Sequence, residues 1–135
     1  MQHDINIHDN EFKLQFENCT LSKDKFGHRG HLRIAWIYLS LYPFSQALEL
    51  ITSGIKRYAA SLGASHIYHE TLTQVWAKLV NKAIQKKQSR TFEDFLLTHP
   101  FLLDKSQPLN YYSQNLLDND NARTQWIEPD LRALN

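Results

Sequence analysis

Apolar residues recur along this chain mainly with the spacing of helices. Within residues 25–42, two apolar stripes run along a predicted helix, and Arg29, Arg33 and Ser40 lie between them. A helix that is apolar on two sides usually packs on two sides, so we expect this segment to be the central helix, ended by Pro43. The first stripe comprises His28, His31, Leu32, Ala35, Leu39 and Tyr42, and the second comprises Ile34, Ile37 and Leu41.

Two further long helices are predicted, over residues 44–62 and 66–87. Gly63 is a suitable C-terminal stop for the first, and Ser65 can cap the second. The inner face of the first comprises Leu48, Ile51, Ile55, Tyr58, Ala59 and Leu62. The inner face of the second comprises His69, Leu72, Thr73, Trp76, Leu79, Val80 and Ala83, whereas Gln74, Lys78 and Asn81 are expected to face out.

The N-terminal part of the chain is less regular. Residues 1–8 are polar and are expected to fray. Residues 9–19 alternate as in a strand, but Phe12 and Phe16 also form an i,i+4 pair behind Asp9, a possible helix cap. We favour a short helix here, because no neighbouring segment offers a clear pairing strand.

The C-terminal third is predicted to cover the bundle. Thr91 followed by Asp94 resembles a capping box and predicts a short helix over residues 92–98. The tail, residues 101–135, carries too many large apolar side chains to be free, so we expect it to wrap the bundle with one or two short helices. The fold class is therefore all-α: one domain over residues 1–135, a compact bundle of three main helices with short flanking helices and a wrapping tail.

Composition narrows the class of protein. The chain has 135 residues, 42% of them hydrophobic and 21% charged, which suits a single folded domain. A net charge of +1 with scattered basic residues argues against a dedicated nucleic-acid binder. The single cysteine, Cys19, forms no internal disulfide and fits a reducing compartment. The N-terminus lacks the features of a signal peptide, and the longest apolar run, residues 34–44, is too short to span a bilayer, so we expect a soluble cytoplasmic protein without membrane contact.

Three histidines are predicted to point inward and form the candidate site. His28 and His31 are one helical turn apart, and His69 opens the inner face of a neighbouring helix. Three histidines with an open position can hold a catalytic zinc, and mixed histidine and carboxylate sets suit iron. Glu70 lies about 100° around the helix from His69, so it is predicted to be a general base or an orienting partner rather than a ligand.

A metal-free site is the second interpretation. Buried imidazoles can titrate near neutral pH, and aromatic side chains could line an apolar pocket for a small-molecule ligand. The aromatic residues concerned are Trp36, Tyr38, Tyr68 and Trp76. The chain contains no glycine-rich phosphate loop, no Gly-x-Ser-x-Gly motif and no activated cysteine.

The competing interpretation gives the histidines structural roles only. Buried polar groups are generally hydrogen-bonded, and His28, His31 and His69 could each be satisfied within the core. The protein would then be a non-catalytic interaction module, or a homo-oligomer, that uses the stripe of Ile34, Ile37 and Leu41 as its surface. The remaining histidines are expected to be exposed or terminal: His3, His8, His66 and His99.

Two motifs resemble those of a family of small all-helical bacterial proteins of uncharacterised activity. The first is Phe-x-His-x-x-His-Leu-Arg-x-Ala-Trp over residues 26–36, and the second is Tyr-His-Glu-Thr over residues 68–71. Tyr111-Tyr112-Ser113 and a Trp-x-x-Pro-Asp-Leu run over residues 126–131 extend the resemblance along most of the chain. The resemblance implies that His28, His31, His69 and Glu70 belong to one shared site, without implying an activity, substrate or cofactor.

Overall fold

The computed structural model describes residues 6–134, and the predicted all-α bundle is confirmed: these residues form helices and no strand. The three main helices are α2 (His28–Leu41), α3 (Phe44–Ser61) and α4 (Glu70–Lys86). The shorter α-helices are α1 (Ile7–Glu17), α5 (Phe92–Thr98), α6 (Gln114–Leu117) and α7 (Asp120–Thr124). Four 3₁₀ turns join them: η1 (Lys23–Lys25), η2 (Ser65–Ile67), η3 (Pro100–Leu103) and η4 (Gln107–Asn110).

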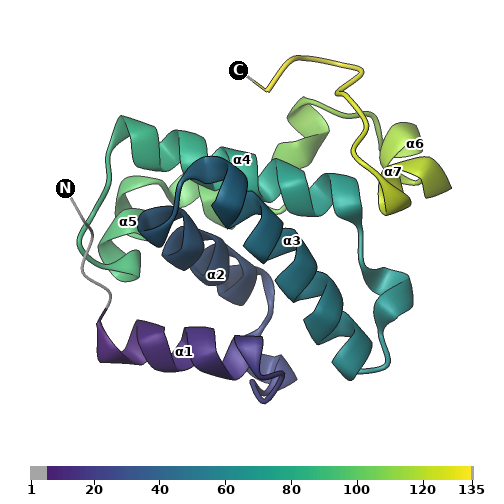
Figure 1. Cartoon of the computed structure of the whole chain (residues 1–135). Coiled ribbons are helices and arrows are strands. Elements are labelled where there is room, and N and C mark those ends of the chain that lie inside the picture. Colours follow the sequence, from purple (N-terminus) through teal and green to yellow (C-terminus); the bar gives the residue numbers. More distant parts are fainter. Residues whose placement is uncertain (1–5, 135) are drawn as a thin grey trace.

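The three main helices pack against one another in pairs, and shorter elements cover their outer sides (Figure 1). Helix α1 lies beneath α2 and α3, whereas α7 and η4 pack on α4. The C-terminal segment therefore lies at the opposite side of the bundle from α1 (Figure 1).

Helix α2 is buried on two sides, as its two apolar stripes predict. Ile34, Trp36 and Ile37 are completely buried, because α2 packs against α1, α3 and α4. This corrects one hypothesis from the sequence: Ile34 and Ile37 belong to the core and leave no apolar surface there for a partner or a second copy. Most of the apolar group that they join lies within the three main helices, as Leu32, Tyr38, Ile51, Val75 and Val80 do.

Several helix ends follow the sequence signals. Helix α2 ends before Pro43, Gly63 after α3 has a φ of +69°, and the Thr91 hydroxyl accepts a hydrogen bond from the Asp94 amide. The start of α1 differs from the prediction. Helix α1 begins at Ile7, where fraying was predicted, and Asn6 is its cap; residues 1–5 lie outside the described part of the chain.

Asp9 has a different role from the predicted cap. It is 3% exposed and accepts hydrogen bonds from Nε and Nη2 of Arg33, at 3.0 and 2.9 Å. The Arg33 guanidinium also covers the ring of Phe12. Arg33, which the helical pattern assigned to a polar face, thus ties α1 to α2.

Helix α4 starts four residues later than predicted. Residues 65–67 form the separate turn η2, and Tyr68 is extended with a ψ of 138°, which breaks the helix. His69 is the true N-cap, since its Nδ1 accepts a hydrogen bond from the Leu72 amide at 3.1 Å. Ser65 makes no capping hydrogen bond to α4.

The tail wraps the bundle as expected, in more pieces than predicted. Leu102, Tyr112, Leu117 and Ala122 are buried against the main helices or one another. The Thr71 hydroxyl on α4 donates a hydrogen bond to the Gln125 carbonyl, and the Tyr112 hydroxyl donates to the carbonyl of Ile127. The first bond fixes the tail on α4 directly after α7, and the second joins two parts of the tail to each other.

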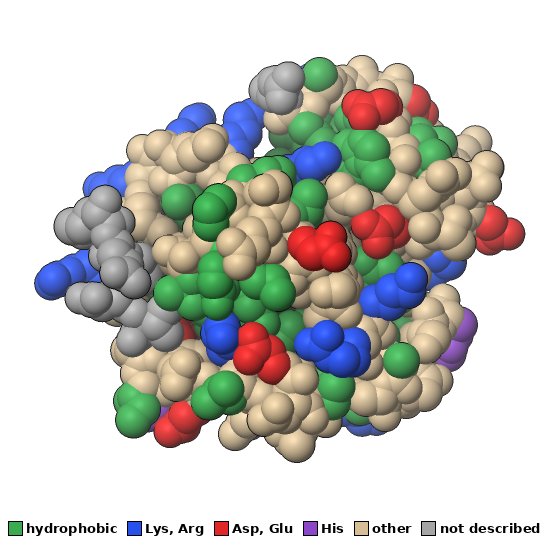
Figure 2. Space-filling view, viewed as in Figure 1, with side chains coloured by type: hydrophobic (Ala, Val, Ile, Leu, Met, Phe, Trp, Pro, Cys, Tyr) green, Lys and Arg blue, Asp and Glu red, His purple; other side chains and the backbone are tan. Residues whose placement is uncertain are grey.

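The surface mixes charges of both signs. On the face in Figure 2, acidic and basic side chains are interspersed around apolar ones over the centre and right, and several basic side chains lie along the upper left edge. Within residues 6–134, no helix is long and apolar enough to cross a membrane.

Candidate functional site

A cavity of about 580 Å³ lies between α2, α3 and α4. Its walls are mainly apolar, with contributions from η1 and η2. The predicted site histidines His28, His31 and His69 all line it. The structure therefore brings the three imidazoles to one cavity, but each is held by the backbone in its own way.

One ring nitrogen of His31 is left without a hydrogen bond within the described residues and can bond a molecule in the cavity. Its Nδ1 lies 2.8 Å from the carbonyl oxygen of Gly27, and because a carbonyl only accepts, Nδ1 carries the proton. In the neutral ring Nε2 is then an acceptor, and among the described residues no partner bonds it. The ring packs on Phe26, with 4.1 Å between centroids. Burial lowers the pKa of His31 below its usual 6.5, although the Gly27 hydrogen bond opposes this.

His28 and His69 anchor the C-terminal segment. His28 Nε2 donates to the carbonyl of Leu102 at 2.8 Å, and His69 Nε2 donates to the carbonyl of Leu117 at 2.7 Å. His69 also accepts from the Leu72 amide, so both of its ring nitrogens are engaged. His28 retains Nδ1, and its ring meets the edge of Trp76 at 4.5 Å between centroids.

The predicted three-histidine metal set is not assembled in this geometry. Within residues 6–134, no three histidine, cysteine, aspartate or glutamate side chains are grouped so that they could hold a metal ion. His69 would have to give up a backbone hydrogen bond to become a ligand. The nitrogens that remain for a metal or a bound molecule are Nδ1 of His28 and Nε2 of His31.

The aromatic residues predicted to bind a ligand divide into two groups. Trp76 and Tyr68 line the cavity. Trp36 does not: it is completely buried behind α5, packs on Phe92 and Phe95, and donates from Nε1 to the Gln88 side chain at 2.9 Å. Tyr38 is buried as well.

Glu70 lies outside the cavity lining and holds Tyr68 in place. Its carboxylate accepts from the Tyr68 hydroxyl at 2.7 Å and from the Gln74 side chain at 2.6 Å. Burial, together with the neighbouring Glu70 charge, raises the pKa of the Tyr68 hydroxyl. Glu70 therefore positions Tyr68 and bonds none of the three histidines, and its predicted role as a general base or orienting partner of the histidine site stays a prediction.

Part of the cavity was missed from the sequence. Helix α3 and the residue after it supply five lining residues that the helical pattern predicts only as an inner face: Ile51, Ile55, Tyr58, Ala59 and Leu62. The same apolar stripe serves a filled core or the wall of a cavity, so no sequence signal distinguishes the two. Lys23 in η1 also lines the cavity, and nothing in its surroundings in the sequence marks it.

Glycine is required where α2 begins. A Cβ atom at Gly30 would lie 2.5 Å from the carbonyl oxygen of Lys25. Backbone oxygen cannot move aside easily, so this close approach excludes other residues and fixes η1 against the start of α2.

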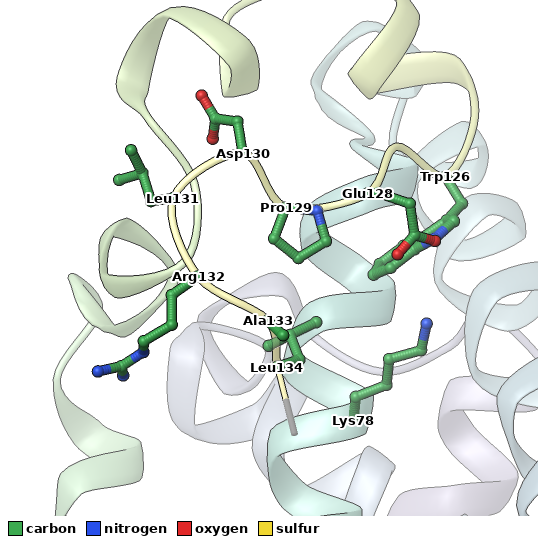
Figure 3. Close-up of a pocket in the computed structure, with 9 residues that line it drawn as sticks. All are labelled: Lys78, Trp126, Glu128, Pro129, Asp130, Leu131, Arg132, Ala133 and Leu134. Atoms are coloured by element: carbon green, nitrogen blue, oxygen red, sulfur yellow. The ribbon is translucent and has the colours of Figure 1, made fainter.

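A second cavity, of about 470 Å³, lies under the C-terminal segment (Figure 3). Lys78 of α4 points toward the ring of Trp126, with Nζ 3.4 Å from the ring centroid, and Glu128 accepts from Trp126 Nε1 at 2.6 Å. Burial lowers the pKa of the Lys78 ammonium, against the opposing charge of Glu128. Lys78 was predicted to face out, but the tail covers it. All the remaining wall is formed by the tail itself, over residues 126–134.

His99 is a further correction. It was expected to be exposed, but it is 7% exposed, and its Nε2 donates to the carbonyl of Lys87 at 2.9 Å. The ring lies between Phe95 and Phe101. His99 is therefore a structural link between the end of α4 and α5, whereas His8 and His66 are exposed as expected.

The lowered pKa of His31 predicts a pH-dependent stability. Because the unfolded chain takes up this proton more readily than the folded one, the free energy of unfolding should fall as the pH drops below about 6.5 and level off once both states are protonated. Denaturant titrations at about pH 7.5 and about pH 5.5 measure the difference. His31→Asn can keep the bond to Gly27 without a titrating ring and should reduce the slope. If the free energy of unfolding depends on pH equally in both proteins, titrating groups other than His31 cause the dependence.

Comparison of the chain with known protein families, with curated proteins and with solved structures finds no match. The resemblance in the two histidine motifs therefore stays a prediction.

Proposed function

We propose that this protein binds a small, largely apolar molecule in the cavity between α2, α3 and α4. The cavity itself is the observation that carries the proposal. A hollow of about 580 Å³ lies within the range of small-molecule pockets, and its mainly apolar wall with a few polar groups is typical of them.

The rim of the cavity supports an apolar ligand. Leu62 is 46% exposed and Ile67 is 64% exposed, and both belong to the lining. Large apolar side chains exposed beside an apolar hollow give a ligand a continuous apolar path from solvent to the interior. Trp76 lies on the same wall and provides a spectroscopic reporter.

Binding of decanol and of the neutral dye Nile red, followed by calorimetry and fluorescence, tests this function. Ala59 of α3 lines the cavity, whereas its neighbour Ala60 is exposed and does not. Ala59→Phe should fill the hollow and weaken binding by roughly tenfold or more, with little loss of stability because empty space receives the ring. Ala60→Phe, the matched control, should bind like the unchanged protein.

The proposal fails on either of two results. The first is that neither molecule shows a saturable site at concentrations where both are monomeric in solution. The second is that binding occurs but is the same in Ala59→Phe and Ala60→Phe, which would place it on another surface.

A second candidate function is the binding of a zinc or iron ion. Such an ion would use the free nitrogens of His28 and His31. A metal-dependent enzyme would need further ligands from water or substrate, because His69 is engaged. Elemental analysis of tag-free protein tests this role. Near-stoichiometric metal that is lost in His31→Asn supports it, and its absence after reconstitution refutes it.

The structural interpretation of the histidines also has support, and it is compatible with a ligand site. His28 and His69 hold tail carbonyls, as core histidines would. Ile34 and Ile37, two of the three residues of the interaction surface that accompanied this interpretation, are buried, so the cavity is the better candidate for function.

A further inference from the structure

Most polar side chains that line the cavity are already bonded within the protein. The Tyr58 hydroxyl donates to the carbonyl of Leu21 at 2.7 Å, and the Tyr68 hydroxyl donates to Glu70. The Thr73 hydroxyl donates to the His69 carbonyl at 2.7 Å, and both ring nitrogens of His69 are used. These groups shape the wall and offer a ligand little polar contact.

Three polar groups of the lining remain. Within residues 6–134, no hydrogen-bond partner bonds Nζ of Lys23, Nδ1 of His28 or Nε2 of His31. All three belong to one short stretch of chain, residues 23–31, in which the backbone of Lys25 closely approaches Gly30. The free polar groups therefore gather on one part of an otherwise apolar wall.

The charge of this wall has one sign. Lys23 is a cation, and the lining includes no aspartate or glutamate. The first turn of α2 follows Gly27, which lines the cavity and provides no side-chain cap, so the partial positive charge of the helix start adds to the same field. An anionic group is favoured at this position, and a cationic one is disfavoured.

We propose that the ligand is an amphipathic carboxylic acid, with its apolar body among α2, α3 and α4 and its head group against Lys23, His28 and His31. The Lys23 ammonium donates to a carboxylate oxygen. An imidazole nitrogen that faces the head group takes up a proton from solvent, and the resulting N–H donates to the second carboxylate oxygen, whose negative charge offsets the burial that otherwise disfavours the imidazolium. This inference rests on the proposed function, because it names the class of ligand that the same cavity takes.

The test compares three ligands with the same apolar body: decanoate, decanol and decyltrimethylammonium, each below its critical micelle concentration. Calorimetry should give decanoate roughly tenfold tighter binding than decanol, with the ammonium compound weakest. Lys23→Gln and His31→Asn should each remove a large part of the preference for decanoate over decanol. Lys25→Gln is the matched control, because Lys25 lies in the same turn but outside the lining.

The possible results distinguish a wrong class of ligand from a wrong proposed function. Equal binding of decanoate and decanol, or tighter binding of the ammonium compound, overturns the inference while the apolar cavity keeps its function. A preference for decanoate that survives Lys23→Gln and His31→Asn together overturns it as well. Failure of all three ligands and of Nile red to bind refutes the proposed function, and the inference falls with it.

Discussion

His69→Ala is expected to lower the free energy of unfolding by about 3 kcal/mol. The ring of His69 is 9% exposed and makes two backbone hydrogen bonds, one to the Leu72 amide and one to the Leu117 carbonyl. Losing the first removes the cap of α4, which costs about 1 kcal/mol. Losing the second leaves a carbonyl of the tail without its partner, which costs about 1–3 kcal/mol. Urea denaturation followed by circular dichroism measures the sum.

Two further variants divide this effect. His69→Asn can still cap α4 but cannot reach the Leu117 carbonyl, so it should lose only part of the stability. His66→Ala replaces an exposed histidine of the preceding turn and should change stability by no more than about 0.5 kcal/mol. A fully stable His69→Ala protein would contradict the structural role assigned to this ring.

Trp36→Ala is expected to destabilise the protein by about 3–5 kcal/mol, the usual cost of emptying a buried tryptophan site. The indole is completely buried, packs on Phe92 and Phe95, and bonds Gln88. Its removal separates α2 from α5 without touching the cavity. Trp36→Phe keeps an aromatic ring at this site and provides the folded variant for the binding measurement, and it should bind decanol like the unchanged protein.

Trp76→Ala is the matched comparison. Trp76 lies half-buried on the cavity wall, so its removal should cost less stability and should weaken decanol binding. Binding lost in Trp36→Phe and kept in Trp76→Ala would reverse the assignment of the two indoles. Calorimetry with decanol and thermal unfolding of each variant give both quantities.

The helices could largely be predicted, because their signals are local. Helix α5 matches the predicted residues 92–98, and α3 differs from its prediction by one residue at its end. The start of α4 could not be predicted, since His69 is an uncommon cap and Tyr68 is held extended by contacts elsewhere in the fold. Asp9 was misplaced for a similar reason: its partner, Arg33, lies on another helix.

The inward direction of the three histidines could be predicted, but their partners could not. The carbonyl that His28 bonds is 74 residues away in the chain, and the one that His69 bonds is 48 residues away. Backbone carbonyls carry no residue identity, so no pattern of side chains marks them. The sequence predicted a shared site for these rings, and the fold uses two of them to secure the tail beside the cavity.

The cavity itself could not be predicted. Ile51 and Ile55 follow the same spacing as residues of a filled core, and only the distance between α3 and α4 decides whether space remains. Trp36 and Trp76 are equally apolar and lie on inner helix faces, yet only Trp76 reaches the cavity. Tertiary packing, which the helical period does not encode, separates them.

The most direct test of the cavity is a titration with decanol followed by two-dimensional NMR of the three tryptophan indole N–H groups. Trp76 lines the cavity, whereas Trp36 lies in the core behind α5 and Trp126 belongs to the tail, where it lines the second cavity. The account predicts a saturable shift of the Trp76 signal, with the Trp36 and Trp126 signals nearly unchanged. Saturable binding that shifts Trp126 and leaves Trp76 in place, or no saturable shift at all, would contradict it.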